Sequence, residues 1–167
     1  MSTLENIKAK ILAGQLLEHQ VQRWKYFNKK IVFTNGCFDL LHSGHIDYLS
    51  KAADMGDALI IGLNSDNSTR RLKGNNRPVN NEEQRSLLLA SLSFVSAVVI
   101  FDEDTPYNLI SKIKPDILVK GGDYKPEQIA GADVVLANGG EVRIIDLLPG
   151  YSTSEIEQRI LKLSREK

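Results

Sequence analysis

Short runs of apolar, often β-branched residues alternate along the chain with longer stretches whose apolar positions recur at helical spacing. The first run, 30–34, is followed by a helical pattern over 44–55 and then by a second apolar run, 58–63. Buried strands that alternate with amphipathic helices are typical of a parallel sheet covered by helices on both faces. The chain is therefore predicted to form a single α/β domain of the doubly wound, Rossmann-like type.

The rest of the chain continues this alternation. Further helices are expected at 82–92, from Pro106 onward and at 152–163, and further strands at 95–101 and 116–120, with one or two shorter strands over 132–137 and 141–145. The sheet should hold about five mainly parallel strands. The polar stretch 64–81 is expected to be a long loop with room for a short helix, and loops of that length in compact domains are usually functional.

Residues 1–28 precede the first strand and are predicted to form an amphipathic helix, with Ile7, Ile11 and Leu12 on one stripe. We expect this N-terminal helical extension to pack on the outside of a domain that spans 29–167, or against a second subunit. Its apolar and aromatic content is compatible with a homodimer.

Composition narrows the functional classes. The 167 residues suit one domain, and 21 basic and 21 acidic side chains give a formal net charge of zero, which argues against a nucleic-acid partner. A single cysteine excludes an intramolecular disulfide framework. The longest apolar runs reach six to eight residues, against about 20 needed to span a bilayer, and the first residues lack the pattern of a signal peptide. A cytoplasmic protein without membrane association is expected.

The first strand leads into the segment Thr34-Asn-Gly-Cys-Phe-Asp-Leu-Leu-His-Ser-Gly-His45, within which a helix begins. Ligands of open α/β sheets bind beyond the carboxyl ends of the strands, where a helix N-terminus offers free amides to phosphate. His42 and His45 are three residues apart and should project from the same side of that helix. Two imidazoles there can donate hydrogen bonds to phosphate oxygens. Zinc is a weaker alternative, because the chain has only three histidines and no cysteine pair.

This segment resembles the signature of the cytidylyltransferase-like nucleotidyltransferases. The resemblance implies that Asp39 buttresses the turn, while Cys37 and Phe38 lie alongside the nucleotide. A nucleophilic role for Cys37 is disfavoured, because members of this family transfer the nucleotidyl group directly. The resemblance extends over about residues 30–160 and implies a fold of the nucleotidyltransferase type.

A second segment that resembles the family lies at the end of the second strand. The segment Gly-Leu-Asn-Ser-Asp, which ends at Asp66, resembles a strand-end motif whose acid faces the phosphates; capping of the following segment is the alternative for this residue. Arg70, Arg71, Lys73 and Arg77 follow within eight residues. We interpret them as a clamp over substrate phosphates, with a solvated basic loop as the alternative.

The head of the last helix, Pro149-Gly-Tyr-Ser-Thr-Ser154, resembles the family's Gly-Ile-Ser-Thr-Thr motif, with Tyr151 in place of isoleucine and Ser154 in place of the second threonine. Its amides and hydroxyls suit an anion. Arg85 belongs to a Glu-Glu-Gln-Arg stretch and is interpreted as structural, part of an ion-paired helix end.

Lys120-Gly-Gly-Asp-Tyr124 is similar to a segment of heptose 1-phosphate adenylyltransferases. Further likenesses to them are Thr34-Asn-Gly-Cys-Phe-Asp39, Arg71-Leu-Lys-Gly74 with Arg77-Pro-Val79, Ala130-Gly-Ala-Asp133 and Asn138-Gly-Gly-Glu-Val142. The resemblance implies transfer of the adenylyl group of ATP to D-glycero-β-D-manno-heptose 1-phosphate, giving ADP-heptose for lipopolysaccharide synthesis. It also implies a separate heptose kinase.

Two alternatives remain open. One is a cytidylyltransferase acting on glycerol 3-phosphate or another alcohol phosphate, although the arginine that precedes the Gly-Ile-Ser-Thr-Thr motif in glycerol-phosphate relatives is missing here; the other is a nucleotide-binding regulatory domain without turnover. The choice of ATP over CTP rests on the resemblance alone. A dinucleotide oxidoreductase is disfavoured, since no Gly-x-Gly-x-x-Gly opens the first helix of the sheet.

The expected site follows from these motifs. The catalytic residues are expected to be His42, His45 and Lys73. The nucleotide-binding set adds Asn35, Gly36, Cys37, Phe38, Asp39, Asp66, Lys120, Gly150, Tyr151, Ser152 and Thr153. The sugar phosphate is expected to meet Arg70, Arg77, Asp102, Glu103, Lys120 and Asp123, with Asp104 as a further acceptor for sugar hydroxyls. No direct protein ligand for a metal is expected, and Mg²⁺ should be held through the phosphates of ATP.

Overall fold

A computed structural model describes residues 2–122, 125 and 128–165 of the chain. In this part of the chain, five parallel strands form one sheet in the order β3-β2-β1-β4-β5. The strands are β1 (Ile31–Gly36), β2 (Ala58–Asn64), β3 (Ala97–Phe101), β4 (Ile117–Gly121) and β5 (Glu141–Ile145). The strand order reverses direction at β1, between β2 and β4, which is where doubly wound sheets bind ligands. The predicted fold class is confirmed.

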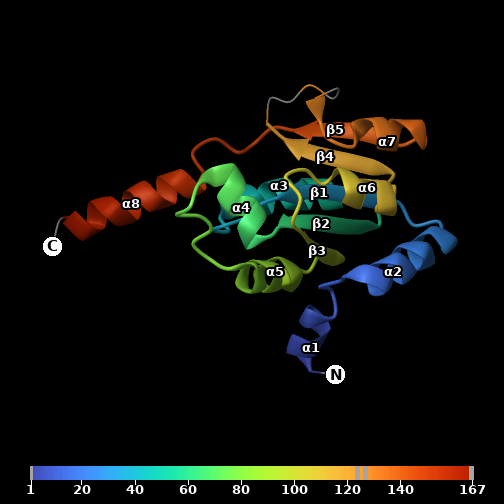
Figure 1. Cartoon of the computed structure of the whole chain (residues 1–167), viewed down its shortest axis with the longest axis horizontal. Helices are drawn as coiled ribbons and strands as arrows, with labels where there is room; N and C mark the ends of the chain where they lie inside the picture. Colours follow the sequence, from blue (N-terminus) through green and yellow to red (C-terminus); the bar gives the residue numbers. More distant parts are fainter. Residues whose placement is uncertain (1, 123–124, 126–127, 166–167) are drawn as a thin grey trace.

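Helices cover both faces of the sheet (Figure 1). They are α1 (Thr3–Lys8), α2 (Gly14–Tyr26), α3 (Ser43–Ala53), α4 (Asp66–Lys73), α5 (Glu82–Ser91), α6 (Tyr107–Ile113), α7 (Ala132–Ala137) and α8 (Thr153–Arg165). Apolar side chains of α2, α6 and α7 form one core cluster with the sheet, and those of α3 and α5 form the other.

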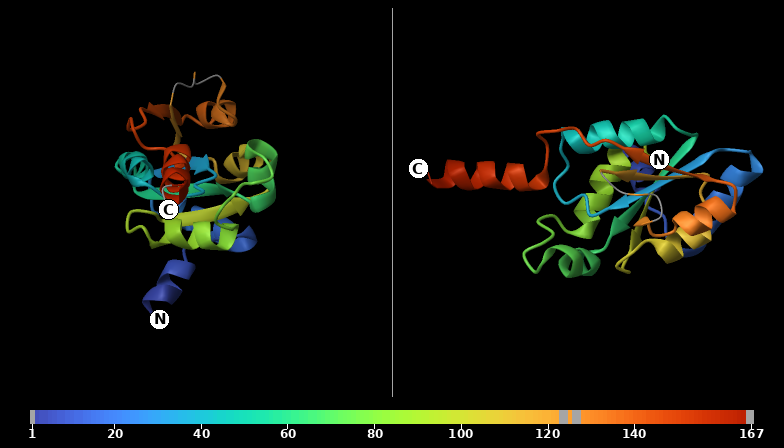
Figure 2. Two further views of the ribbon diagram at one scale, coloured as in Figure 1. Left: turned by 90° about the vertical axis from the view of Figure 1, so that its left-hand side faces the viewer. Right: turned by 90° about the horizontal axis from the view of Figure 1, so that it is seen from above.

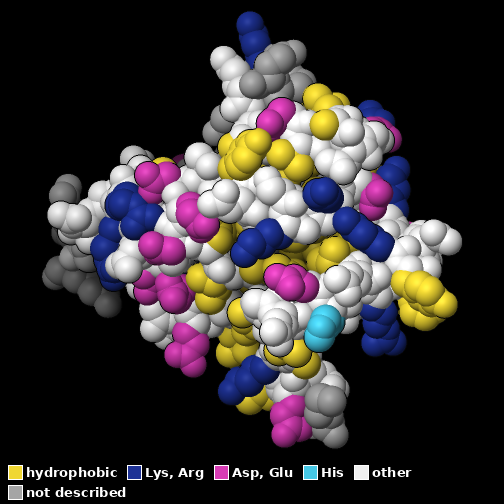
Figure 3. Space-filling view, turned by 45° about the vertical axis from the view of Figure 1, so that its right-hand side comes forward, with side chains coloured by type: hydrophobic (Ala, Val, Ile, Leu, Met, Phe, Trp, Pro, Cys, Tyr) yellow, Lys and Arg dark blue, Asp and Glu magenta, His cyan; other side chains and the backbone are white. Residues whose placement is uncertain are grey.

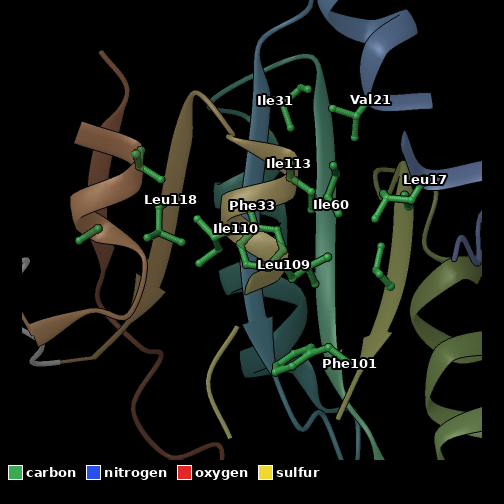
Figure 4. Close-up of a cluster of buried hydrophobic side chains, with 14 of the residues drawn as sticks. Leu17, Val21, Ile31, Phe33, Ile60, Phe101, Leu109, Ile110, Ile113 and Leu118 are labelled. Atoms are coloured by element: carbon green, nitrogen blue, oxygen red, sulfur yellow. The ribbon is translucent and has the colours of Figure 1, made fainter. Parts of the chain in front are cut away.

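Alternation along β1 explains the two cores. Ile31 and Phe33 point into the cluster beneath α2 and α6, whereas Val32 between them belongs to the cluster beneath α3. Figure 4 shows the first cluster, in which Phe33 and Ile110 lie together between the sheet and α6. Complete burial of side chains of this size stabilises the fold by about 1.5–3 kcal/mol each. The sheet is thereby a rigid platform for residues at its carboxyl edge.

The segment 132–137 is a helix, and the prediction of a strand there was wrong. Ala132 and Val135 are buried at helical spacing while Leu136 is exposed. Gly131 begins α7 with a φ of 85°, and a Cβ at this position would lie 2.7 Å from Ile110 of α6. The helix is the crossover that connects the parallel strands β4 and β5, a connection that a β-strand cannot supply.

The N-terminal extension consists of two helices, not the single helix predicted. Between them the chain runs beside β3, where the Leu12 amide donates to the Val98 carbonyl at 2.9 Å and Ile11 pairs with Val98 in a parallel bridge. Leu17 and Val21 of α2 are buried in the first core cluster. The segment between α1 and α2 thus covers β3, the edge strand of the sheet, whose backbone groups would otherwise be unpaired.

The polar stretch after β2 is more ordered than a long loop. Helix α4 occupies its first half, and its N-cap Ser65 accepts a hydrogen bond from the Ser68 amide at 3.0 Å. Residues 74–81 form the remaining loop. The short helix allowed for in this region is thus present and takes up half of it.

Candidate active site

A cavity of about 560 Å³ opens at the carboxyl edge of the sheet. The ends of β1, β2 and β4 form its floor, and segments that follow β3 and β4 form its walls. Its lining residues are Asn35, Gly36, Cys37, Phe38, His45, Tyr48, Asn64, Leu72, Lys73, Asp104, Thr105, Pro106, Lys120, Gly121, Gln128, Ile129, Ala130 and Leu147. The position agrees with the ligand-binding edge expected for this topology.

His42 and His45 form a stacked pair at the start of α3. His42 is the N-cap residue in an extended conformation, and the two ring centroids lie 3.8 Å apart with an interplanar angle of 24°. The edge of Phe38 contacts the second ring, with centroids 5.3 Å apart. Each histidine has a buried Nδ1 atom without a hydrogen-bond partner among the described residues. Buried polar atoms are normally paired, so these two Nδ1 atoms remain available to a ligand.

Burial keeps both imidazoles neutral at neutral pH. It lowers the pKa of His45 to about 4, and the nearby charges of His42 and Lys73 act in the same direction. Burial also lowers the pKa of His42, against the opposing effect of Glu155. A bound anion would reverse these shifts, because opposite charge favours the protonated ring.

Gly44 lets the head of α8 approach this pair. A Cβ at this position would lie 3.0 Å from Nδ1 of His42 and 3.0 Å from Cβ of Tyr151. Any larger residue would therefore displace the histidine or the 149–154 segment. The contact brings Tyr151 beside the N-terminus of α3, so two motifs about a hundred residues apart in sequence meet at one site.

Asp39 attaches the turn after β1 to the loop after α4. Its buried carboxylate accepts hydrogen bonds from the amides of Val79 (2.7 Å) and Asn80 (3.1 Å) and from Nη1 of Arg77 (2.9 Å). Arg77 also forms an ion pair with Glu157 of α8. The arginine thus joins three segments around the site.

Arg85 of α5 is fully buried behind the cavity and binds several backbone segments at once. Its guanidinium donates to the carbonyls of Cys37 (2.6 Å), Asn64 (2.8 Å) and Asn80 (3.0 Å). It also pairs with the carboxylate of Asp66 at 2.7 Å. The structural, ion-paired interpretation of this arginine is confirmed, and the residue fixes the ends of β1 and β2 relative to each other.

The structure places Asp66 in this ion pair. Its carboxylate faces Arg85 and does not line the cavity, while the capping role belongs to Ser65. A buried guanidinium needs a counter-charge, which α4 supplies at its first residue.

Of the four basic residues expected to form a clamp, two line the cavities and two do not. Lys73, at the end of α4, lines the main cavity and also a smaller one of about 310 Å³ formed with Asp39, Arg77, Thr153 and Ser154. Arg70 bonds to Asn67 on the surface, and Arg71 pairs with Asp104 after β3. Neither Arg70 nor Arg71 lines either cavity.

Lys120 enters the main cavity from β4. Its ammonium donates to Oδ1 of Asn35 at 3.1 Å, and burial lowers its pKa. At the head of α8, Gly150 has a φ of 81° and Ser152 caps the helix, accepting from the Glu155 amide at 3.1 Å. Thr153 lines the smaller cavity, whereas the Tyr151 side chain is half-exposed.

The acids expected to meet the sugar are distributed differently. Asp102 and Glu103 line a separate cavity between α2 and the end of β3, whereas Asp104 lines the main one. Asp123 lies outside the described residues. Sequence reasoning also missed Thr105, Pro106 and the segment 128–130 in the cavity wall. Their position after β3 and β4 was the available signal, because all parallel strands end at this edge.

Both cavities lie within the part of the chain that matches a known family. The profile of the family described as cytidylyltransferase-like matches residues 33–159, which include both cavities. The chain belongs to the cytidylyltransferase-like family of nucleotidyltransferases. The stacked histidines, Lys73 and the head of α8 therefore lie within the family domain.

Members of the cytidylyltransferase-like family with high similarity include proteins named Bifunctional protein HldE. The chain is 58% identical to that of Campylobacter concisus over 132 residues, which are 79% of this chain and 27% of that protein. It is 60% identical to that of Campylobacter jejuni serotype O:2 over 136 residues, 81% of this chain and 29% of that protein. The chain thus spans less than a third of the length of these relatives.

Two solved structures share the fold of this chain. A lipopolysaccharide core biosynthesis protein from Thermoplasma volcanium aligns with a TM-score of 0.57 and 29% identity, over 72% of this chain and 97% of that one. A pantoate-beta-alanine ligase from Francisella tularensis aligns with a TM-score of 0.56 over 88% of this chain and 75% of that one. Its 17% identity establishes likeness of fold alone.

Among residues 2–122, 125 and 128–165, no group of three His, Cys, Asp or Glu side chains is placed to hold a metal ion. No described helix has the length and apolar character to cross a bilayer. On the face in Figure 3, acidic and basic side chains are interspersed.

Proposed function

We propose that this chain transfers the adenylyl group of ATP to D-glycero-β-D-manno-heptose 1-phosphate, giving ADP-heptose and pyrophosphate. The observation that carries the proposal is the stacked pair of His42 and His45 near Lys73. The two buried Nδ1 atoms of this pair have no hydrogen-bond partner among the described residues. High identity to the HldE proteins supports the heptose substrate. The solved lipopolysaccharide core biosynthesis protein supports the same pathway class.

The reaction needs positioning and charge neutralisation more than proton transfer. A phosphate oxygen of the sugar attacks the α-phosphorus of ATP in line, an O–P bond forms, and the bond to the β-phosphate oxygen breaks as pyrophosphate leaves. The attacking phosphate is already an anion, so no general base is required. The imidazoles of His42 and His45 donate hydrogen bonds to phosphate oxygens, and the Lys73 ammonium offsets the charge that develops on them.

The two cavities suggest how the substrates divide between them. The nucleoside and α-phosphate occupy the larger cavity, near the histidines and Lys120. The terminal phosphates extend past Lys73 into the smaller cavity, where Arg77 and the hydroxyls of Thr153 and Ser154 meet them. Asp104, Gln128 and Lys120 are the polar groups of the larger cavity available to the sugar phosphate.

Mg²⁺ is expected to enter with the triphosphate and to be held through the phosphates of ATP. The reaction requires a sugar kinase activity that supplies the sugar 1-phosphate. The balanced charge and single cysteine favour a cytoplasmic enzyme.

A pyrophosphate-release assay tests the proposal directly. ATP and CTP are each combined with heptose 1-phosphate, glycerol 3-phosphate and phosphocholine, with the His42→Ala variant as a blank. We expect release with ATP and heptose 1-phosphate. Release with CTP and an alcohol phosphate would replace this function with the cytidylyltransferase alternative. ATP binding without pyrophosphate release from any pair would favour the regulatory domain.

A further inference from the structure

Helix α8 leaves the domain and projects away from it (Figures 1 and 2). Near its start, Glu157 forms an ion pair with Arg77. Residues 158–164 are all exposed. By contrast, the apolar face of α2 is covered, because Leu17 and Val21 are buried in the core.

An apolar stripe runs along the projecting helix. Ile156, Ile160 and Leu163 follow the i, i+4, i+7 spacing and therefore share one face. Ile160 and Leu163 are each 57% exposed. Leu161 is 51% exposed but lies about 100° around the helix from Ile160, outside the stripe.

Charge is distributed unevenly along α8. The first half carries Glu155 and Glu157, whereas Arg159 and Lys162 follow in the second half. When two such helices lie antiparallel, the acidic half of each is beside the basic half of the other, and their dipoles oppose. A parallel pair would place like charges together.

We propose that α8 is a self-association surface and that two copies of this chain pair antiparallel through Ile156, Ile160 and Leu163. The two-fold axis passes near Ile160, so that Ile156 of one copy meets Leu163 of the other. Such an interface is self-complementary, as two-fold symmetry requires. Helices of this kind pack with axes about 20° from antiparallel.

Charge also distinguishes this occupant from a membrane surface. Helices that lie in a lipid interface carry mainly lysine and arginine on the polar face. The polar residues of α8 include acids of its first half as well as bases of its second half. A second copy of the chain matches that arrangement, while an anionic bilayer would repel Glu155.

Sedimentation velocity of the full chain over a concentration series tests the pairing. The wild-type protein should shift from monomer to dimer as concentration rises, and Ile160→Glu should remain monomeric. Leu161→Glu is the matched control, because it places the same charge on an equally exposed leucine outside the stripe; it should dimerise like the wild type. A monomeric wild type, or equal effects of the two substitutions, would overturn the proposal.

Directed cross-linking tests the orientation. Ile156→Cys and Leu163→Cys proteins, mixed and mildly oxidised, should give a disulfide-linked heterodimer, whereas each alone should cross-link weakly. The native Cys37 is buried and provides little background. Stronger cross-linking of each variant with itself would contradict the antiparallel arrangement. Flotation of a monomeric wild type with phosphatidylglycerol vesicles would assign the stripe to lipid instead.

Discussion

The imidazole rings of His42 and His45 stack face to face at the N-terminus of α3, with their Nδ1 atoms buried and unpartnered among the described residues. Two rings this close cannot both carry a proton at low energetic cost, and burial adds to that cost. The pair is therefore neutral until an anion arrives. Each neutral ring still has one N–H to donate.

Substitution of His42 by alanine should lower turnover by about 10²-fold or more, because one preorganised donor to the phosphates is lost. Steady-state pyrophosphate release measures this. His19→Ala is the control, since that histidine is exposed on α2 and lines neither cavity of the site. Unaltered turnover in His42→Ala would remove the residue from the mechanism.

Stability should fall as the pH is lowered from 6.5 towards about 4, because the pKa of His45 is depressed to about 4 in the folded protein. As the pH falls through this window, the unfolded chain binds the proton first, so the free energy of unfolding decreases as the pH is lowered. Above pH 6.5 the group has no such effect. Urea denaturation across the window measures the slope, and His45→Asn should flatten it. An equal slope in that variant would assign the pH dependence to other groups.

Arg85→Ala should destabilise the fold by about 3 kcal/mol or more, because it leaves Asp66 and buried carbonyls without their cation. Urea unfolding of the purified variant gives the value. Arg70→Ala removes an exposed arginine and should stay within about 0.5 kcal/mol of the wild type. Comparable losses in the two variants would mean that the buried network contributes little.

Gly44→Ala should reduce kcat/KM by about 10-fold or more with little change in overall fold, because the added methyl group meets His42 and Tyr151 at 3.0 Å. Kinetics and circular dichroism together separate the two effects. The neighbouring Ser43→Ala serves as the control, since Ser43 is exposed. Full activity in Gly44→Ala would show that the contact tolerates a side chain.

Local sequence patterns predicted some of these structural features but not others. The strands of the sheet and the turn that carries His42 and His45 are encoded by contiguous residues, so periodicity and motif spacing predicted them. The pairing of Asp66 with Arg85 joins residues from different elements, and no local pattern specifies it. Ala132–Ala137 has the composition of a strand, but the connection between parallel strands requires a helix there.

Lys73 lines both cavities and therefore lies at the boundary between them. In the proposed placement of ATP, a nucleoside monophosphate fills the larger cavity and does not extend beyond the lysine. A longer phosphate chain would also meet Arg77 and the hydroxyls of Thr153 and Ser154 in the smaller cavity. We therefore expect the chain to bind a nucleoside triphosphate more tightly than the corresponding monophosphate.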